Sequence, residues 1–191
     1  RDGQLTSVPN VISVPMVVST PVQTAVPVGK TVLFDASTPP VIVNNKLSRS
    51  YTKEAWIKIP ADNQGHYNIV SGGITGHHAF LIENRKVGSG HNGVWSAVKC
   101  EDSISQGWEH YAVSYDTDTR EMKLYKNGKM VSSAKDVPPY GGENFVQIGR
   151  WSNSDGDANI FIGEMAEVRI WNYVRSEDQI AAQMNVFVPK A

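Results

Sequence analysis

The sequence predicts an all-β chain folded as a single antiparallel β-sandwich, a jelly roll, with one short helix near its C-terminal end. Tyr111, Val113 and Tyr115 alternate with small residues within residues 109–116, which is the two-residue period of a strand with two different faces. Asn127-Gly128 then separates two apolar runs, and this pair favours the positive φ angles that a type I′ hairpin turn requires. Many further short apolar runs are separated by turns that contain Gly and Pro, which is typical of sandwiches and barrels.

The remaining elements are predicted in order from the same signals. Short apolar or alternating runs bounded by turn residues predict strands at residues 31–35, 41–43, 51–59, 66–70, 79–83, 94–99, 122–126, 130–131, 145–148 and 160–171. Loops are expected at residues 71–78, 88–93, 132–144 and 151–159. Ser176-Glu177-Asp178-Gln179 is a capping box, so Ser176 is expected to begin a helix. Ile180, Ala181 and Met184 would provide the buried stripe of that helix.

The first 30 residues differ in character from the rest, so we divide the chain into an extended segment (1–30) and a sandwich domain (31–191). Prolines fall at positions 9, 15, 21 and 27, and no charge occurs between Asp2 and Lys30. Proline lacks the N–H that a central strand needs, so an edge strand or an extended clamp is expected. We expect the segment to lie across the sandwich or to exchange with a partner chain; a disordered linker is the alternative.

Three stretches of the sequence resemble motifs of a known family, and they follow one another along the chain in the order that the family has. Residues 108–129 contain Trp-Glu-His-Tyr-Ala-Val-Ser-Tyr-Asp and then Met-Lys-Leu-Tyr-Lys-Asn-Gly-Lys. Residues 50–59 contain Tyr-Thr-Lys-Glu-Ala-Trp-Ile, and residues 147–171 contain Gln-Ile-Gly-Arg and then Gly-Glu-Met-Ala-Glu-Val-Arg-Ile-Trp. Together they resemble the laminin-G-like and pentraxin-like jelly rolls of the concanavalin A-like lectin/glucanase superfamily, over residues 31–184. The resemblance implies the fold, but this fold hosts enzymes, lectins and adhesion modules alike.

Composition excludes several classes of function. The 191 residues carry a formal net charge of −1 with Lys and Arg scattered singly, so no nucleic-acid partner is expected. No apolar run approaches the ~20 residues of a membrane span, so no membrane insertion is expected. The single cysteine, Cys100, cannot form an intramolecular disulfide and is expected to pack as a small apolar residue. A secreted or extracellular location is expected, although this chain carries no signal peptide.

An enzymatic role is not expected. Glycoside hydrolases on this fold place their carboxylates at alternating positions of one strand, so that they point into the same cleft. The nearest candidates, Glu164 and Glu167, are three residues apart and would face opposite sides of a regular strand. Glu109 and Asp116 are also separated by an odd number of residues.

Calcium is the cofactor that the sequence suggests. In residues 151–159, Asn153, Asp155 and Asp157 alternate, and Gly156 permits a tight path. Calcium takes six to eight oxygen ligands, often from alternating residues of one loop. The pentraxin resemblance places its calcium-binding loop at the matching position, although the earlier Asp-Asn pair of that family has no clear counterpart here. The alternative is an Asx-rich turn without a metal.

Sugar-binding residues are predicted in the same irregular regions. A sugar ring has an apolar face and a hydroxyl edge, so its sites combine an aromatic platform with planar polar side chains. Trp56, Trp108 and Trp171 lie inside the strand motifs and are expected to be core. The predicted carbohydrate-binding residues are therefore His77, His78, His91, Asn92, Trp95, Trp151 and Asn153.

These observations favour a non-enzymatic, lectin-like protein that binds glycans or glycoconjugates. The site is expected on loops at one end of the sandwich, with calcium as a possible cofactor and with a homo-oligomer formed through the N-terminal segment to add avidity. Two alternatives stay open. A protein-binding adhesion module predicts an exposed apolar patch, and a glycan-degrading enzyme predicts paired carboxylates in a deep groove.

Overall fold

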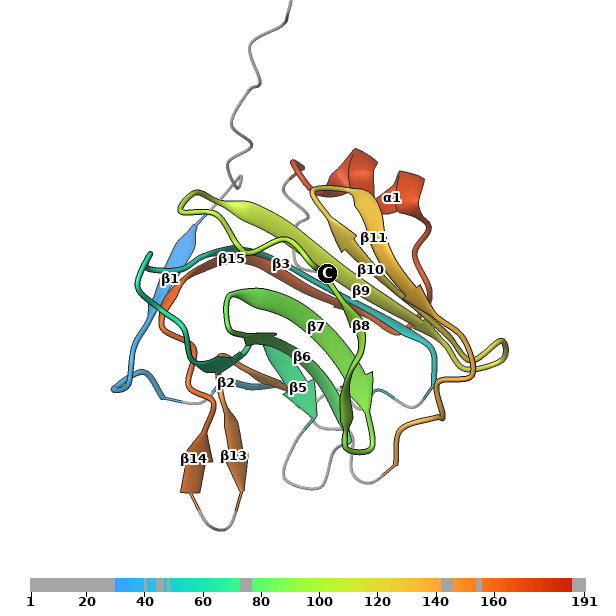
Figure 1. Cartoon of the computed structure of the whole chain (residues 1–191), viewed down its shortest axis with the longest axis horizontal. Helices are drawn as coiled ribbons and strands as arrows, with labels where there is room; N and C mark the ends of the chain where they lie inside the picture. The colour runs from blue at the N-terminus through green and yellow to red at the C-terminus, as the bar shows by residue number, and fades with distance from the viewer. Residues whose placement is uncertain are drawn as a thin grey trace, which may run out of the picture.

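The computed structural model of the chain describes residues 30–39, 41–43, 47, 49–72, 77–141, 146–153 and 156–186, without the side chains of residues 152–158. It confirms the predicted antiparallel sandwich. The larger layer is a six-stranded sheet, seen as the long upper layer in Figure 1. Its strands, in order across the sheet, are β1 (Thr31–Phe34), β15 (Gly163–Trp171), β3 (Tyr51–Lys58), β9 (Glu109–Asp116), β10 (Glu121–Lys126) and β11 (Lys129–Ala134).

The facing layer consists of two smaller sheets. One has four strands in the order β4 (His66–Asn68), β6 (His78–Glu83), β7 (Lys86–His91) and β8 (Val94–Lys99). The other has three strands in the order β2 (Val41–Val43), β12 (Val146–Ile148) and β5 (Val70–Gly72). A separate hairpin, β13 (Trp151–Asn153) with β14 (Gly156–Ala158), projects from the lower side of the sandwich in Figure 1.

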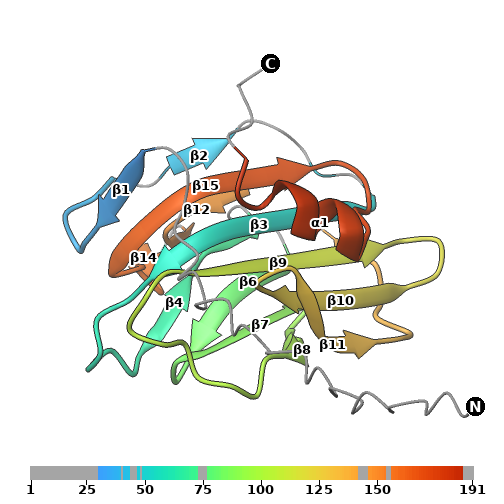
Figure 2. The ribbon, with the colours of Figure 1, turned by 90° about the horizontal axis from the view of Figure 1, so that it is seen from above.

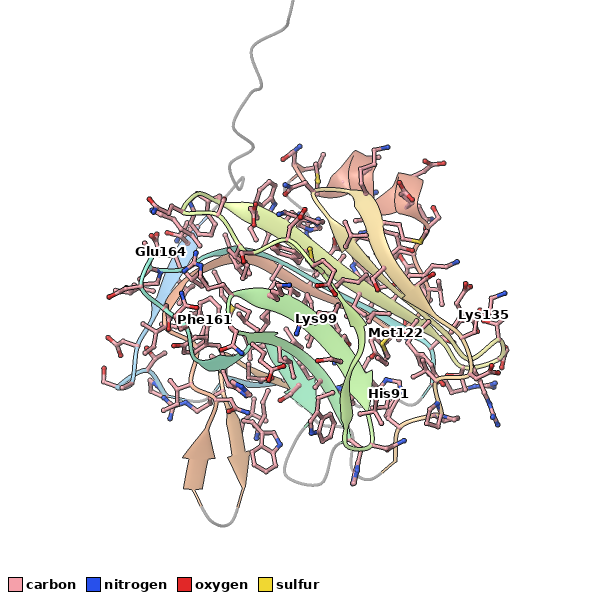
Figure 3. All side chains as sticks on the ribbon, in the orientation of Figure 1. His91, Lys99, Met122, Lys135, Phe161 and Glu164 are labelled. Atoms are coloured by element: carbon pink, nitrogen blue, oxygen red, sulfur yellow. The ribbon has the colours of Figure 1, made fainter. Side chains whose placement is uncertain are left out.

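The core fills the space between the layers, and the central strands are covered on both faces. Tyr51, Ala55 and Ile57 point from β3 into this core, where Met122 and Phe161 also lie (Figure 3). The opposite face of the six-stranded sheet is covered by α1 (Glu177–Gln183), as Figure 2 shows. Because both faces are covered, nearly every residue of β3 and β9 is buried.

The helix begins as the sequence predicts. The Ser176 hydroxyl accepts a hydrogen bond from the Gln179 amide, and the Gln179 side chain accepts one from the Ser176 amide, which completes the capping box. Ile180 is the buried residue of the helix and packs against Ala112 and Tyr125 of the sheet. No helix in the described part of the chain is long and apolar enough to cross a membrane.

The predicted hairpin turn is also confirmed. Asn127 and Gly128 have φ angles of 49° and 78° and connect β10 to β11. A Cβ atom at position 128 would lie 2.9 Å from the Cα atom of Ala181, so glycine is required both by the turn and by the close approach of α1. The Asn127 side chain accepts a hydrogen bond from the His110 amide and fixes the turn against β9.

Two predicted loops turn out to be strands. Residues 88–93 were expected to be a loop, yet Gly88 and Gly90 belong to β7, and only Asn92-Gly93 forms the turn to β8. The glycines serve close backbone approach, because a Cβ at position 90 would lie 1.7 Å from the Val94 carbonyl oxygen. Within residues 151–159, which were expected to be an irregular loop, Trp151–Asn153 and Gly156–Ala158 pair as β13 and β14. Strand β11 runs to Ala134, so the connection expected at 132–144 begins later.

The tryptophans expected in the core differ in burial. Trp56 is fully buried, whereas Trp108 and Trp171 are half-buried. Cys100 is buried in the core, as expected. The proline-spaced segment, residues 1–29, lies outside the described residues, so its predicted path stays a prediction.

Candidate functional site

The β7–β8 turn lies at the lower side of the sandwich in Figure 1, the side from which the β13–β14 hairpin also projects. Three predicted sugar-binding residues, His77, Asn92 and Trp95, are exposed around this turn, and we call them the rim. The Trp95 residue is 42% exposed, so the rim carries an accessible aromatic ring as well as polar groups. Trp151 opens the neighbouring hairpin and is half-buried.

Hydrogen bonds hold the rim in one conformation. Asn92 has a φ of 51°, and its amide donates to the His77 carbonyl at 2.8 Å. Its side chain donates to the Pro139 carbonyl at 2.7 Å and accepts from the Gly141 amide at 3.3 Å. The side chain therefore ties the turn to the connection at 135–141, and the rim is a preorganised surface.

His78 and His91, which were predicted to contact sugar, are instead buried, with 1% of each side chain exposed. They are cross-strand partners on β6 and β7, and His91 lies at the end of β7 near the rim (Figure 3). His91 Nδ1 lies 2.9 Å from the Pro138 carbonyl oxygen and Nε2 lies 2.9 Å from the Tyr51 hydroxyl. A carbonyl only accepts, so Nδ1 carries the proton and Nε2 accepts from Tyr51. Both imidazole rings make contacts within the protein and are buried, so neither is accessible to a ligand.

A polar aromatic cluster lies directly behind the rim, and the sequence reasoning missed it. We define this inner cluster as Tyr51, Lys53, His78, His91, Tyr115 and Tyr140. The buried Lys53 amine lies 2.7 Å from His78 Nδ1 and 3.2 Å from the Val70 carbonyl oxygen. Tyr140 comes from the connection at 135–141, and its ring lies 5.0 Å from each of the two histidine rings, measured between centroids.

One signal in the sequence could have revealed the inner cluster. Lys53 lies between Tyr51 and Ala55, so it occupies an inward-facing position of a strand that is otherwise apolar on that face. A lysine at such a position must either reach solvent or find buried partners. Burial lowers the pKa of the Lys53 amine well below its usual value, which favours the neutral form beside His78.

The buried histidines make stability depend on pH. Burial lowers the pKa of His91 to about 4, opposed by its contact with Pro138 and assisted by Lys53. The unfolded chain therefore binds more protons than the folded chain between pH ~6.5 and pH ~4, so stability falls as the pH falls through this window. We expect a loss of up to about 3 kcal/mol, measured as the free energy of unfolding in urea at several pH values.

The matched variant for this measurement is His91→Gln, because glutamine can donate to Pro138 and accept from Tyr51 without titrating. We expect H91Q to lose part of the pH dependence, with His78 supplying the remainder, since its pKa is also lowered by burial. Identical pH profiles for the native chain and H91Q would show that His91 does not contribute.

The side chains of the predicted metal ligands lie outside the part of the chain that the structure describes. Asp155 lies outside the described residues, and only the backbones of Asn153 and Asp157 are described. Those backbones belong to opposite strands of the hairpin, where Asn153 pairs with Gly156 and Asp157 with Ser152. Among the side chains that are described, no three His, Cys, Asp or Glu residues are grouped so that they could hold a metal ion. The calcium site stays a prediction.

Three of the four carboxylates considered for catalysis are engaged in ion pairs, and the fourth, Asp116, accepts hydrogen bonds from the Asp118 and Thr119 amides. Glu164 lies 3.2 Å from the Lys58 amine, and Glu167 lies 2.9 Å from the Arg169 guanidinium. A β-bulge falls between Ala166 and Arg169, and Glu167 has a φ of 48°, so the counting argument for a regular strand does not apply across this point. Glu109 accepts from the Tyr111 hydroxyl and pairs with Lys126.

A hollow lies away from the rim, beside α1. It has a volume of about 740 Å³ and lies between strands β10 and β11 and the start of the helix. Its lining is mixed, with Tyr125, Met130 and Val174 next to charged residues such as Lys123 and Glu177. None of the predicted sugar-binding residues lines it.

An antiparallel sandwich with a tryptophan-bearing, hydrogen-bonded rim is a lectin-like β-sandwich. The family model described as the concanavalin A-like lectin/glucanases superfamily, of the laminin G type, matches residues 35–181. The chain therefore belongs to this superfamily, and the family resemblance of the sequence is confirmed.

Comparison with individual proteins agrees with this assignment. Jeltraxin of Lepidobatrachus laevis is 33% identical over 81 residues, which are 39% of this chain and 36% of Jeltraxin, so the match spans about a third of that relative. The heptameric SAP-like pentraxin of Limulus polyphemus has a TM-score of 0.63 at 17% identity, with 79% of each chain covered. The CBM40 domain of the Ruminococcus gnavus IT-sialidase, solved with α2,3-sialyllactose, has a TM-score of 0.60 at 18% identity, covering 71% of this chain and 83% of that domain. At these identities the two structures show the shared fold.

Proposed function

We propose that the chain is a non-enzymatic carbohydrate-binding protein whose site is the rim. The observation that carries this proposal is the half-exposed Trp95 beside a turn fixed by hydrogen bonds. An aromatic ring held in this way can stack on the apolar face of a sugar without losing much conformational freedom. His77 and Asn92 lie at the same turn and offer hydrogen-bonding groups to sugar hydroxyls.

The inner cluster has a supporting role in this proposal. His91 and Asn92 bond to Pro138 and Pro139, and the Tyr115 hydroxyl donates to the Val137 carbonyl at 2.9 Å. These contacts fix the connection at 135–141 against the rim. Trp151 and Asn153, on the neighbouring hairpin, are proposed to extend the site for glycans longer than one sugar. The sialyllactose complex of the CBM40 domain supports a glycan as the ligand class.

The test is Trp95→Ala, with binding measured on a glycan array and then by calorimetry for the best glycan. Loss of the stacking platform is expected to weaken binding about tenfold, which is 1.4 kcal/mol. The matched control is Tyr173→Ala, because Tyr173 is also exposed but lies on the segment before α1. Equal binding by W95A and the native chain, or absence of any bound glycan, would overturn the proposal.

Calcium is proposed as a cofactor of the β13–β14 hairpin, with Asn153, Asp155 and Asp157 as ligands. Amide and carboxylate oxygens are the donors that calcium takes, and three of them fall within five residues. Repeating the array with a chelator tests this separately from sugar binding. Unchanged binding would remove the metal and leave the rim; loss of binding that added calcium restores would support both.

We also propose that the protein acts outside the cell and as an oligomer. Single sugar sites are weak, and several sites on one assembly add avidity without any new contact. The apolar N-terminal segment is the proposed means of assembly.

A protein-binding adhesion module is the second candidate function, and the hollow beside α1 favours it. This candidate predicts that substitutions in the hollow, such as Met130→Asp, abolish partner binding and leave glycan binding unchanged.

A further inference from the structure

One edge of the sandwich is open. Strands β1 and β2 are the outermost strands of their sheets and follow one another along the same edge (Figure 2). Phe34 of β1 is buried in the core, but Val32, on the same face two residues earlier, is 52% exposed. Val43 of β2 packs against the core, but Val41 on its face is 42% exposed. The described residues therefore do not cover the space between the layers at this edge.

The outward-facing residues of the same two strands are apolar as well. Leu33 is 68% exposed and Ile42 is 55% exposed. Leu33 is the cross-strand partner of Glu164, which Figure 3 shows at the far end of the six-stranded sheet. We call these four residues, Val32, Leu33, Val41 and Ile42, the β1–β2 edge. Exposed aliphatic side chains thus lie on both faces of these two short edge strands, which is typical of an interaction surface.

The β1–β2 edge also offers backbone hydrogen bonds. Strand β1 pairs with β15 on one side, and the described residues place no strand on its other side. The N–H and C=O groups on that side are free to pair with an added strand. A partner for this edge should therefore be an extended segment with apolar side chains on one face.

The sequence before β1 has this character. Between positions 8 and 28 the even-numbered residues are mostly aliphatic: Val8, Ile12, Val14, Met16, Val18, Val22, Val26 and Val28. The prolines at 9, 15, 21 and 27 are all odd-numbered. In an extended strand, odd- and even-numbered residues point their side chains to opposite faces and their backbone groups to opposite edges. One edge of the segment thus keeps all its N–H groups, whereas proline interrupts the other edge.

We propose that a short stretch within residues 8–28 of a second copy of the chain binds as an added strand along β1. Its even-numbered side chains would close the gap between Val32 and Val41, and the prolines would prevent a further strand from adding to the outer edge. The length of the segment allows this exchange: at ~3.3 Å per residue it spans ~70 Å, of which only ~13 Å is needed to pair with the four residues of β1. A segment that extends so far beyond its own edge reaches a neighbouring molecule.

This inference supplies the assembly on which the proposed multivalency rests, and it is tested without a glycan, so its failure would leave the rim proposal untouched. The measurement is the mass of the full chain in solution by light scattering. Leu33→Asp places a charge on the β1–β2 edge, and Val18→Asp places a charge on the apolar face of the N-terminal segment. Each is expected to reduce the oligomer to the monomer.

Two matched controls are available. Ser19→Asp puts the same charge one residue along, on the proline face of the segment, and Val131→Asp puts it on β11, the opposite edge strand of the same sheet. Both are expected to keep the native mass. A monomeric native chain, or an equal loss of mass in the controls, would overturn the proposal.

Hydrogen exchange separates a second copy from the chain's own segment. Exchange protection of the β1 amides is expected in the oligomer and is expected to disappear when it dissociates, either on dilution or in V18D. Protection that persists in a native monomer would show that the segment folds back on its own edge, and would contradict exchange between copies.

Discussion

Replacing Glu54 with alanine is expected to destabilise the protein by about 3–5 kcal/mol, a large part of the 5–15 kcal/mol that stabilises a typical domain. The carboxylate is fully buried on the outer face of β3 and accepts hydrogen bonds from Arg175 and from the Trp171 indole, each at 2.6 Å. His110 Nε2 lies 3.2 Å from its other oxygen. Removing the carboxylate leaves the buried Arg175 charge without its counter-ion, which is the costly case.

The pKa of Glu54 reflects this surrounding. Burial alone raises it, but the close contact with His110, the hydrogen bond from Trp171 and the charge of Arg175 lower it overall. The carboxylate therefore stays ionised in the folded protein. The loss of folding stability in Glu54→Ala is measured as the free energy of unfolding in urea at neutral pH, monitored by tryptophan fluorescence.

Glu164→Ala is the control for E54A, because Glu164 forms an ion pair with Lys58 while both remain partly exposed. Such pairs contribute less than about 1 kcal/mol. If E54A does not fold, Glu54→Gln keeps an acceptor for Trp171 and removes only the charge, and an intermediate loss is expected. Equal losses in E54A and E164A would show that the Arg175 pair does not anchor the helix segment.

Gly90→Ala is expected to cost several kcal/mol and to abolish glycan binding, because there is no space for a side chain at this position of β7. The Cβ atom would lie 1.7 Å from the Val94 carbonyl oxygen and 2.9 Å from the Trp95 carbonyl carbon, which are backbone atoms of β8. The two strands must separate at the irregularity between Ser89 and His91. Trp95 and the rim turn would move with them.

Gly107→Ala is the control for G90A, because the nearest atom to its Cβ is a serine oxygen 3.8 Å away. Thermal unfolding and glycan affinity are measured on both variants. A G90A protein with native stability would mean that the two strands tolerate separation at this point. Native stability without glycan binding would place Gly90 in the site itself rather than in its support.

The fold could be predicted from the sequence wherever local chemistry decides the structure. Asn127-Gly128 and the capping box at Ser176 depend on a few adjacent residues, and both were predicted correctly. Gly88 and Gly90 were assigned to a loop because glycine in a strand gives no local signal. Only the closeness of β8, a tertiary contact, explains why those positions carry no side chain.

The exposure of the candidate site residues could be predicted only in part, for the same kind of reason. The sequence located the irregular regions that carry exposed Asn92 and Trp95, but it could not separate them from His78 and His91 nearby. Their burial depends on the connection at 135–141, which comes from a distant part of the chain and covers them with Tyr140. The odd spacing of Glu164 and Glu167 likewise does not predict which faces of the strand they occupy, because the strand contains a β-bulge at this point. No turn residue in the sequence indicates that bulge.

Strand β3 places Lys53 and Glu54 next to each other in the chain but on opposite faces of the six-stranded sheet, one in the inner cluster and one beneath the helix. The backbone of β3 thus separates two polar networks: the inner cluster around Lys53, and the ion pair of Glu54 with Arg175. Substitutions in one network should combine additively with substitutions in the other, although their Cα atoms are neighbours. The rim side of the molecule can therefore change in sequence while the helix side keeps the stability of the fold.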